Sequence, residues 1–165
     1  MVATPSSASI NWDELAQSFG SIEVIREPSQ REKLSKDYYH FSPVLEGLLA
    51  DKVANLVVRP ANEEEVLRAA KVCVEAKVPV TVRGAGTGNY GQCIPLNGGV
   101  VLDLSKISTV KWVKPGVACV EPGAKLSLID KATRAIGWEI RMYPSTYRTA
   151  TIGGFIGGGS GGIGS

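Results

Sequence analysis

The sequence predicts an α+β fold, in which a small parallel βαβ subdomain near residues 55–104 precedes the start of a second, largely antiparallel subdomain. Three observations support this prediction. Apolar, strand-like runs flank a segment of helical periodicity in the first part. Two short β-branched runs joined by a tight turn follow it. The length of 165 residues fits one ordinary domain that can bury a core.

The sequence divides into two predicted units: an N-terminal helical segment over residues 1–50 and a second unit over residues 51–165. Asn11 is a typical N-cap for a short helix, which Gly20 ends. A second helix that carries Leu34, Tyr38 and Tyr39 is expected between Pro28 and Pro43.

A strand is predicted at Leu56–Val58, where an apolar run is closed by a proline. Asn62 and Glu65 have the spacing of a capping box, so a helix should follow. Its broad apolar face comprises Val66, Leu67, Ala69, Ala70, Val72 and Cys73. The next strand, Val80–Val82, lies far enough along the chain to pair in parallel with the first. A further strand is expected at Val100–Leu104.

The antiparallel part begins with two strands, Val110–Val113 and Val117–Val120. Lys114, Pro115 and Gly116 join them as a turn, so an antiparallel hairpin is expected. Helical spacing then returns over residues 124–136, and Gly137 ends the helix.

Composition excludes several function classes. Apolar residues make up 44% and charged residues 21% of the sequence, as in globular proteins, so neither disorder nor a membrane span is expected. The net charge of +2 is small and evenly spread, so no nucleic-acid partner is expected. Since His40 is the only histidine, neither a His-rich metal site nor a Ser-His-Asp triad is expected. Three widely spaced cysteines without a secretory signal predict a reducing, cytoplasmic compartment.

Glycine is the one compositional outlier, with 19 among 165 residues, where about 7% would be usual. The glycines gather in a first glycine cluster, Gly84–Gly91, and a second glycine cluster, Gly153–Gly164. Residues without a Cβ allow the backbone to approach a ligand closely. The first cluster follows the predicted strand Val80–Val82, and ligands of open parallel sheets bind beyond the carboxyl ends of strands.

Gly86–Gly91 matches the G-x-G-x-x-G pattern of nicotinamide-binding Rossmann units. That interpretation requires a helix that starts within the motif, and residues 92–98, with Pro95 and Gly98, are too few and too irregular to supply it. A Walker A loop is excluded because no Gly-Lys-Ser/Thr end is present. An anion-binding nest of backbone N–H groups or a wide turn without ligand are the remaining interpretations. Arg83 either adds charge to this loop or holds it.

The second glycine cluster is either a flexible tail or a packed segment. Large apolar side chains interrupt its glycines, and a solvated linker would gain nothing from exposing them. We therefore expect packing through Ile152, Phe155, Ile156 and Ile163.

Four motifs in a fixed order carry a resemblance to a known family. They are the segment Leu56–Val66, the loop Arg83–Gly88, the segment Val120–Gly123 and the segment Thr151–Gly154. Together they resemble the FAD-linked oxidases with a PCMH-type FAD-binding domain, the type found in p-cresol methylhydroxylase and vanillyl-alcohol oxidase. Within that family, the glycolate oxidase and D-lactate dehydrogenase branch is most similar. The resemblance implies that the chain stops inside the FAD-binding domain, before the substrate domain.

The resemblance implies FAD as the cofactor and assigns its contacts to three sets of residues. The pyrophosphate would lie against Arg83, Gly84, Ala85, Gly86, Thr87, Gly88 and Asn89. The cofactor's other side would be lined by Pro144, Ser145, Thr149, Thr151, Ile152, Gly153 and Gly154. The flavin ring system would be approached by Gly158, Gly159, Ser160, Gly161 and Gly162. No catalytic residue is identified.

Many covalent members of the family carry histidine where Thr87 stands, so the resemblance implies noncovalent FAD. It also implies an oxidoreductase that transfers a hydride to FAD from a 2-hydroxy acid, such as glycolate or lactate, or from a related alcohol. The electron acceptor is unspecified, and this chain alone is expected to be inactive. Two alternatives stay open: a non-catalytic FAD- or nucleotide-binding module that acts with a partner chain, and a structural domain without ligand.

Overall fold

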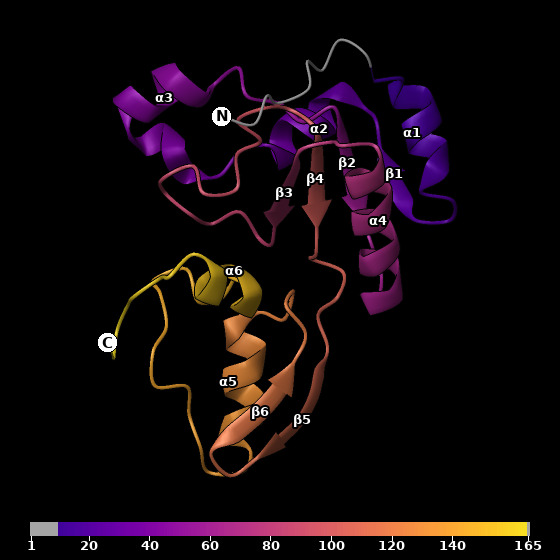
Figure 1. The fold of residues 1–165 in the computed structure, drawn as a ribbon. Helices are drawn as coiled ribbons and strands as arrows, with labels where there is room; N and C mark the ends of the chain where they lie inside the picture. Colours follow the sequence, from indigo (N-terminus) through magenta and orange to yellow (C-terminus); the bar gives the residue numbers. More distant parts are fainter. Residues whose placement is uncertain (1–9, 165) are drawn as a thin grey trace.

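The computed structural model describes residues 10–164 and consists of two parts that lie end to end (Figure 1). Residues 1–9 of the predicted N-terminal segment and Ser165 lie outside the described residues. The first part contains α1 (Trp12–Ser18), β1 (Glu23–Ile25), α2 (Pro28–Leu34), the 3-10 helix η2 (Tyr38–Phe41), α3 (Pro43–Leu49), β2 (Leu56–Arg59), α4 (Glu63–Glu75), β3 (Val80–Arg83) and β4 (Val100–Asp103). The second part contains β5 (Val110–Lys114), β6 (Val117–Val120), α5 (Leu126–Arg134) and α6 (Ile152–Gly157). The predicted α+β fold class is confirmed.

The first part is built on a four-stranded sheet with the order β1-β2-β4-β3. Val100 of β4 pairs in parallel with Leu56 of β2 on one side and with Val80 of β3 on the other. The direct pairing predicted between β2 and β3 is therefore wrong, although α4 does connect two parallel strands. Every residue of β4 is buried, and such a strand is most stable at the centre of a sheet that is covered on both faces.

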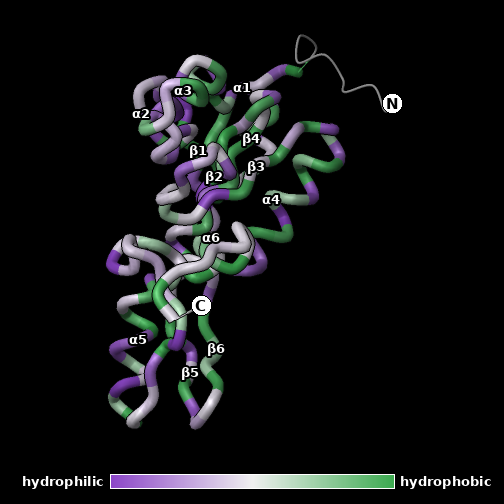
Figure 2. The backbone as a smooth tube through the Cα atoms, turned by 90° about the vertical axis from the view of Figure 1, so that its left-hand side faces the viewer, coloured by the Kyte–Doolittle hydropathy of each residue, from purple (hydrophilic) through white to green (hydrophobic). Residues whose placement is uncertain are grey.

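Helices cover both faces of this sheet. On one face, Phe19, the C-cap of α1, and Cys73 of α4 pack with Leu56, Val58 and neighbouring strand residues. On the other face, Val57 and Val101 form a smaller cluster against α2. Successive residues of β2 thus point to opposite cores, which explains why the strand is apolar throughout and does not alternate. Figure 2 shows the hydrophobic character of these central strands.

The N-terminal segment differs from the prediction in two respects. Asn11 caps α1 as expected, since its side chain accepts hydrogen bonds from the next turn. However, β1 pairs antiparallel with β2, so part of this segment belongs to the sheet. The predicted second helix is also divided, because α2 ends at Leu34 and Ser42 caps a new helix that has Pro43 in its first turn. The boundary near residue 50 stays a prediction.

The second part begins with the predicted antiparallel hairpin of β5 and β6, whose turn holds Gly116 at φ +79°. Within these two strands no residue is buried. A small core of Leu126, Ala150 and Phe155 instead joins α5 to α6. The predicted stop of α5 is present, since Gly137 has a φ of +81°. The second part therefore packs mainly around α5 and α6.

Candidate functional site

The two glycine clusters face each other across one cavity of about 880 Å³. Strands β3 and β4 point toward α6 (Figure 1), so the cavity lies beyond the carboxyl ends of parallel strands, where ligands of such sheets bind. Its volume falls within the range of about 300–1,000 Å³ that is typical of small-molecule sites. The predicted site residues that line it are Arg83, Gly84, Ala85, Gly86, Thr87, Gly88, Asn89, Pro144, Ser145, Thr151, Gly153, Gly154, Gly158, Gly159, Ser160, Gly161 and Gly162.

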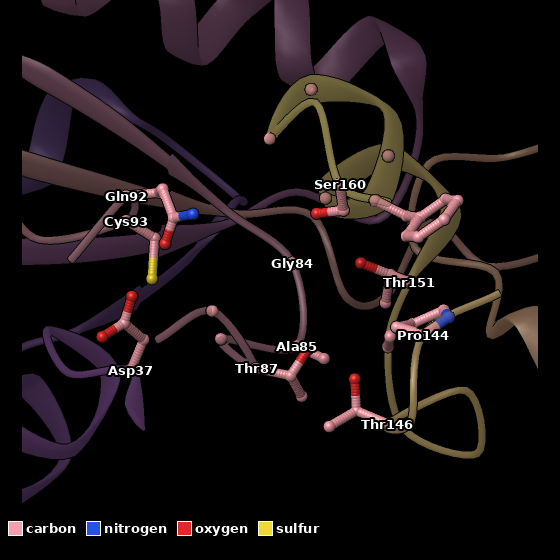
Figure 3. A pocket seen from close by; sticks show the side chains of 18 of the residues that line it. Asp37, Gly84, Ala85, Thr87, Gln92, Cys93, Pro144, Thr146, Thr151 and Ser160 are labelled. Carbon is pink, nitrogen blue, oxygen red and sulfur yellow. The ribbon is translucent and has the colours of Figure 1, made fainter. Parts of the chain in front are cut away.

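Figure 3 shows how the lining is arranged. Asp37, Gln92 and Cys93 gather at one end of the cavity. Pro144, Thr151 and Ser160 lie at the other end, with the loop that carries Gly84 and Thr87 between the two groups. The cavity therefore joins the N-terminal segment, the first glycine cluster and the second glycine cluster.

The Arg83–Asn89 loop has the backbone of an anion-binding loop. It contains no helix, which agrees with rejection of the Rossmann interpretation. Within residues 10–164, the backbone N–H groups of Gly84 to Asn89 have no hydrogen-bond acceptor. Gly86 adopts a φ of +67°, a left-handed conformation that favours glycine. A loop with unpaired, neighbouring N–H groups suits a negatively charged ligand.

Arg83 holds this loop in place. Its Nη1 donates to the carbonyl oxygen of Lys36 at 2.6 Å and lies 3.5 Å from Cys93 Sγ. The residue is only 8% exposed. A Cβ at Gly86 would overlap the Arg83 guanidinium, so this glycine gives the side chain its space. Of the two predicted roles for Arg83, the structure shows the supporting one.

The second glycine cluster uses its backbone differently. Residues 152–157 form the short helix α6, and Gly153 donates to the carbonyl of Pro122 at 2.9 Å. A Cβ at Gly153 would lie 2.8 Å from Pro122 Cβ. Ser160 N–H donates back to the carbonyl of Phe155 at 3.1 Å. These glycines allow the chain to pack closely on itself, and the predicted packed segment replaces the flexible tail.

Thr151 links the two clusters. A Cβ at Gly84 would overlap the Thr151 hydroxyl, so the first cluster approaches the second at this point. Thr151 is 4% exposed, and its Oγ1 has no hydrogen-bond partner within the described part of the chain. A buried hydroxyl without a partner costs free energy unless a ligand satisfies it. The unpaired hydroxyl and the unpaired loop N–H groups both fit a phosphate-containing cofactor.

Two predicted site residues do not line the cavity. Thr149 is exposed, and its hydroxyl donates to the carbonyl of Thr146 at 3.0 Å. Ile152 packs against the core that joins α5 and α6. The packing prediction for the second cluster is likewise half wrong, because Phe155 is buried whereas Ile156 is 71% and Ile163 is 64% exposed. Apolar spacing within a glycine-rich segment did not show which side chains face inward.

One end of the cavity was not predicted from the sequence. Asp37, Gln92 and Cys93 line it, as do Tyr90, Thr146 and Gly157. Burial raises the pKa of the Asp37 carboxyl, and it also raises the pKa of the Cys93 thiol. Asp37 lies far from the glycine clusters in sequence, and no local signal connects it with them. For Cys93, proximity to the first cluster was an available but weak signal.

Other chemistry has little support within residues 10–164. No group of three or more His, Cys, Asp or Glu side chains there is arranged to hold a metal ion. None of the helices of this described part has the length and apolar character needed to cross a membrane. Cys73 is buried, which raises its thiol pKa to about 11 and keeps it in the unreactive thiol form.

Comparison with protein families then identifies the ligand class. Residues 54–165 match the family described as "FAD binding domain". The chain belongs to this FAD-binding family. The match covers both glycine clusters, so FAD, the cofactor expected from the four motifs, is confirmed at the level of the family.

The relatives of this FAD-binding chain include D-lactate dehydrogenase of Archaeoglobus fulgidus, which is 34% identical over 130 residues, 77% of this chain and 29% of the relative. The glycolate oxidase subunit GlcD of Escherichia coli is 34% identical over 110 residues, 66% of this chain and 22% of the relative. Among solved structures, p-cresol methylhydroxylase with bound substrate has a TM-score of 0.70 at 21% identity, over 88% of this chain and 29% of the other. This likeness confirms the PCMH-type fold. The chain spans less than a third of the length of these curated relatives.

Proposed function

We propose that the chain is the FAD-binding part of a flavin-dependent oxidoreductase that oxidises a 2-hydroxy acid, such as glycolate or lactate, or a related alcohol. The observation that carries this proposal is the cavity between the two glycine clusters. One wall has N–H groups, and the other has the Thr151 hydroxyl, that find no partner in the part of the chain that the structure describes. Its fit to FAD is supported by the family to which the chain belongs.

In this proposal the pyrophosphate lies against the Arg83–Asn89 loop. Two phosphates carry negative charge that several backbone N–H donors can share, and residues without a Cβ permit close approach. Arg83, which donates a hydrogen bond to the carbonyl of Lys36, fixes the loop and contributes positive charge nearby. Pro144, Ser145, Thr151, Gly153 and Gly154 form the opposite wall, and residues 158–162 approach the flavin ring system.

Noncovalent attachment is part of the proposal. Thr87, at the position where the resemblance places histidine in covalent members, offers no nucleophilic nitrogen. His40 is exposed and is not among the lining residues. Cys93 does line the cavity, but burial raises the pKa of its thiol and so disfavours the reactive thiolate.

The substrate class is proposed from the relatives. Those named above are described as D-lactate dehydrogenase and as a subunit of glycolate oxidase, and both named substrates are 2-hydroxy carboxylates. When bound, FAD supplies hydride acceptance, while the protein supplies placement and electrostatics. Among residues 10–164, Arg83 supplies the one cationic side chain that lines the cavity, and it already donates to the Lys36 carbonyl. We therefore propose that the substrate carboxylate is recognised by residues outside this chain.

The proposal also includes the division of the chain into two units and the cellular compartment of the protein. Residues 51–165 act as the FAD-binding unit, and residues 1–50 support it, in a protein of the cytoplasm. The electron acceptor stays open, because nothing in the cavity lining selects one.

The test uses the full-length protein. We expect yellow protein whose flavin remains in solution after acid precipitation, and colour in the pellet would contradict noncovalent binding. Under anaerobic conditions, glycolate or D-lactate should bleach the oxidised-flavin absorbance, whereas acetate and propionate, which lack the 2-hydroxyl, should not. Flavin that binds but is bleached by no hydroxy acid or alcohol would favour the non-catalytic module.

A further inference from the structure

We propose that Asp37 is a positioning residue of the cofactor site, which holds the Arg83–Asn89 loop in the conformation that receives FAD. Asp37 precedes residues 54–165, the segment that matches the FAD-binding family. The inference rests on the proposal that this loop contacts FAD.

The segment of residues 36–38 holds the loop at three points. Arg83 Nη1 donates to the carbonyl of Lys36 at 2.6 Å. Tyr38 N–H donates to the carbonyl of Gly88 at 2.8 Å. Gly91 N–H donates to Asp37 Oδ2 at 3.1 Å. Three consecutive residues, which we call the brace, are thus hydrogen-bonded to the residue before the first glycine cluster, to Gly88 within it and to Gly91 at its end.

Asp37 is central to the brace because its two carboxylate oxygens bind different elements. Oδ1 accepts the N–H of Tyr39 at 2.9 Å and thereby caps η2. Oδ2 accepts the N–H of Gly91, two residues after the loop. A Cβ at Gly88 would lie 3.1 Å from the same Oδ2, so the loop backbone passes directly beside the carboxylate. One side chain therefore connects the position of η2 to the conformation of the loop.

A buried carboxylate beside an anion-binding loop needs an explanation. Asp37 is 4% exposed and lies at the end of the cavity, next to Cys93 (Figure 3). Burying this charge opposes folding, although Arg83 and the N–H donors offset part of the cost. An uncharged residue would avoid that cost. A role in ordering the loop before FAD arrives explains the carboxylate, because pre-organised donors lose less entropy on binding.

The decisive variant is Asp37→Asn, measured in the full-length apoprotein by FAD titration and by thermal unfolding. Asparagine keeps one oxygen to cap η2 and replaces the other with an amide nitrogen, which cannot accept from Gly91. We expect the FAD dissociation constant to rise about tenfold, as for loss of a hydrogen bond to a charged group. The melting temperature should not fall, because the buried charge is also removed. Unchanged FAD affinity would overturn the proposal.

Ser42→Ala is the matched control. Ser42 Oγ accepts the N–H of Leu45 and caps α3 in the same region, without contact to the loop. This variant should lower the melting temperature and leave FAD affinity unchanged. If Asp37→Asn instead lowers the melting temperature as Ser42→Ala does and leaves FAD affinity equally unaffected, Asp37 is only a helix cap and the proposal fails.

Tyr38→Pro tests the brace by a second route. Tyr38 is the first residue of η2, where proline is tolerated, and Asp37 before it already has extended backbone. The change removes the N–H that binds Gly88 and also the ring that contacts His40 and Phe41, so Tyr38→Ala, which keeps the N–H, is its control. Chymotrypsin cleavage after the exposed Tyr90 should accelerate in both Tyr38→Pro and Asp37→Asn, because a loop released from the brace fits a protease more readily. Unaltered cleavage at Tyr90 in both variants would overturn the brace.

The proposed function and the brace can fail separately. If Gly86→Ala leaves FAD affinity unchanged in a protein that binds FAD, the loop assignment itself is wrong. If Gly86→Ala weakens FAD binding and the two brace variants do not, the loop assignment stands and only the role of Asp37 is refuted.

Discussion

The two glycine clusters look alike in sequence but serve different physical purposes. In the first cluster, the N–H groups of Gly84 to Asn89 are unpaired within the described chain. The cluster is held in place by the hydrogen bonds of Arg83 to Lys36 and of Gly91 to Asp37. In the second cluster, Gly153, Gly158 and Gly159 donate to carbonyls of their own part of the molecule. The first cluster is suited to bind a ligand, and the second is suited to pack.

This difference teaches that glycine content alone does not locate ligand contacts. Gly153 has no room for a Cβ because Pro122 occupies the space, whereas a Cβ at Gly157 would meet nothing within 4 Å. Both line the cavity. Of these two glycines, the one without room for a side chain is thus required by the protein's own packing. Stability and cofactor affinity should therefore respond to different glycines.

The largest effect is expected for Gly153→Ala. The new Cβ would lie 2.8 Å from Pro122 Cβ and 2.9 Å from its carbonyl oxygen, so the α6 segment must shift. Overpacking of this kind costs about 1–3 kcal/mol, and circular dichroism should show a lower melting temperature. Gly157→Ala is the control, since it gains helix propensity without a clash. Equal stability of the two variants would show that the second cluster does not pack as described.

Gly86→Ala should act on FAD affinity more than on stability. The substitution strains a left-handed residue and drives its Cβ into the Arg83 guanidinium, which disturbs the loop donors. Loss of one hydrogen bond to a charged group corresponds to about a tenfold rise in the FAD dissociation constant. Gly116→Ala carries similar strain at φ +79° in the β5–β6 turn, with open space around it. It should lower stability comparably and leave flavin-fluorescence titrations unchanged, and any FAD effect there would undermine the comparison.

Local patterns predicted most of the fold. The cap at Asn62, the strands at Val80 and Val100 and the turn at Gly116 all depend on residues near one another in sequence, and all are present. The order of the sheet could not be derived, because β4 inserts between β2 and β3 through long-range packing. Likewise, β1 has only three residues, and its pairing with β2 rather than its own sequence makes it a strand.

The candidate site was predicted where the backbone itself carries the signal. Glycine clusters mark unusual backbone, so most of both walls was found. Asp37 was missed because its role arises only when residues 36–38 meet the loop, more than forty residues later in the chain. Thr149 and Ile152 do not line the cavity, since the Thr149 hydroxyl donates to the carbonyl of Thr146 and Ile152 packs against the core that joins α5 and α6.

Thr151→Val tests whether the unpaired hydroxyl on the second wall serves the ligand. Valine has nearly the same shape and removes a buried oxygen that has no partner within residues 10–164, so the apoprotein should become slightly more stable. FAD should bind about two- to tenfold more weakly if this hydroxyl donates to it. Thr149→Val, outside the cavity, is the control and should not alter FAD affinity. Tighter or unchanged FAD binding by Thr151→Val would remove Thr151 from the site.

The smallest expected effect is a change of stability with pH. It should arise at the first glycine cluster, which Asp37 holds, and not at the second, which contains no titratable side chain. Burial raises the pKa of Asp37 above the value of about 3.9 expected in the unfolded chain, with Arg83 and Cys93 as the ionisable groups that face it. The folded state therefore favours protonated Asp37. Its contribution to stability is fully present below the unfolded pKa and is lost as pH rises through the folded pKa. The free energy of unfolding of Asp37→Asn, relative to that of the wild type, should thus increase from acidic to neutral pH. Denaturant titrations at several pH values measure this difference. A constant difference would show that the Asp37 carboxyl has the same pKa in the folded and the unfolded chain.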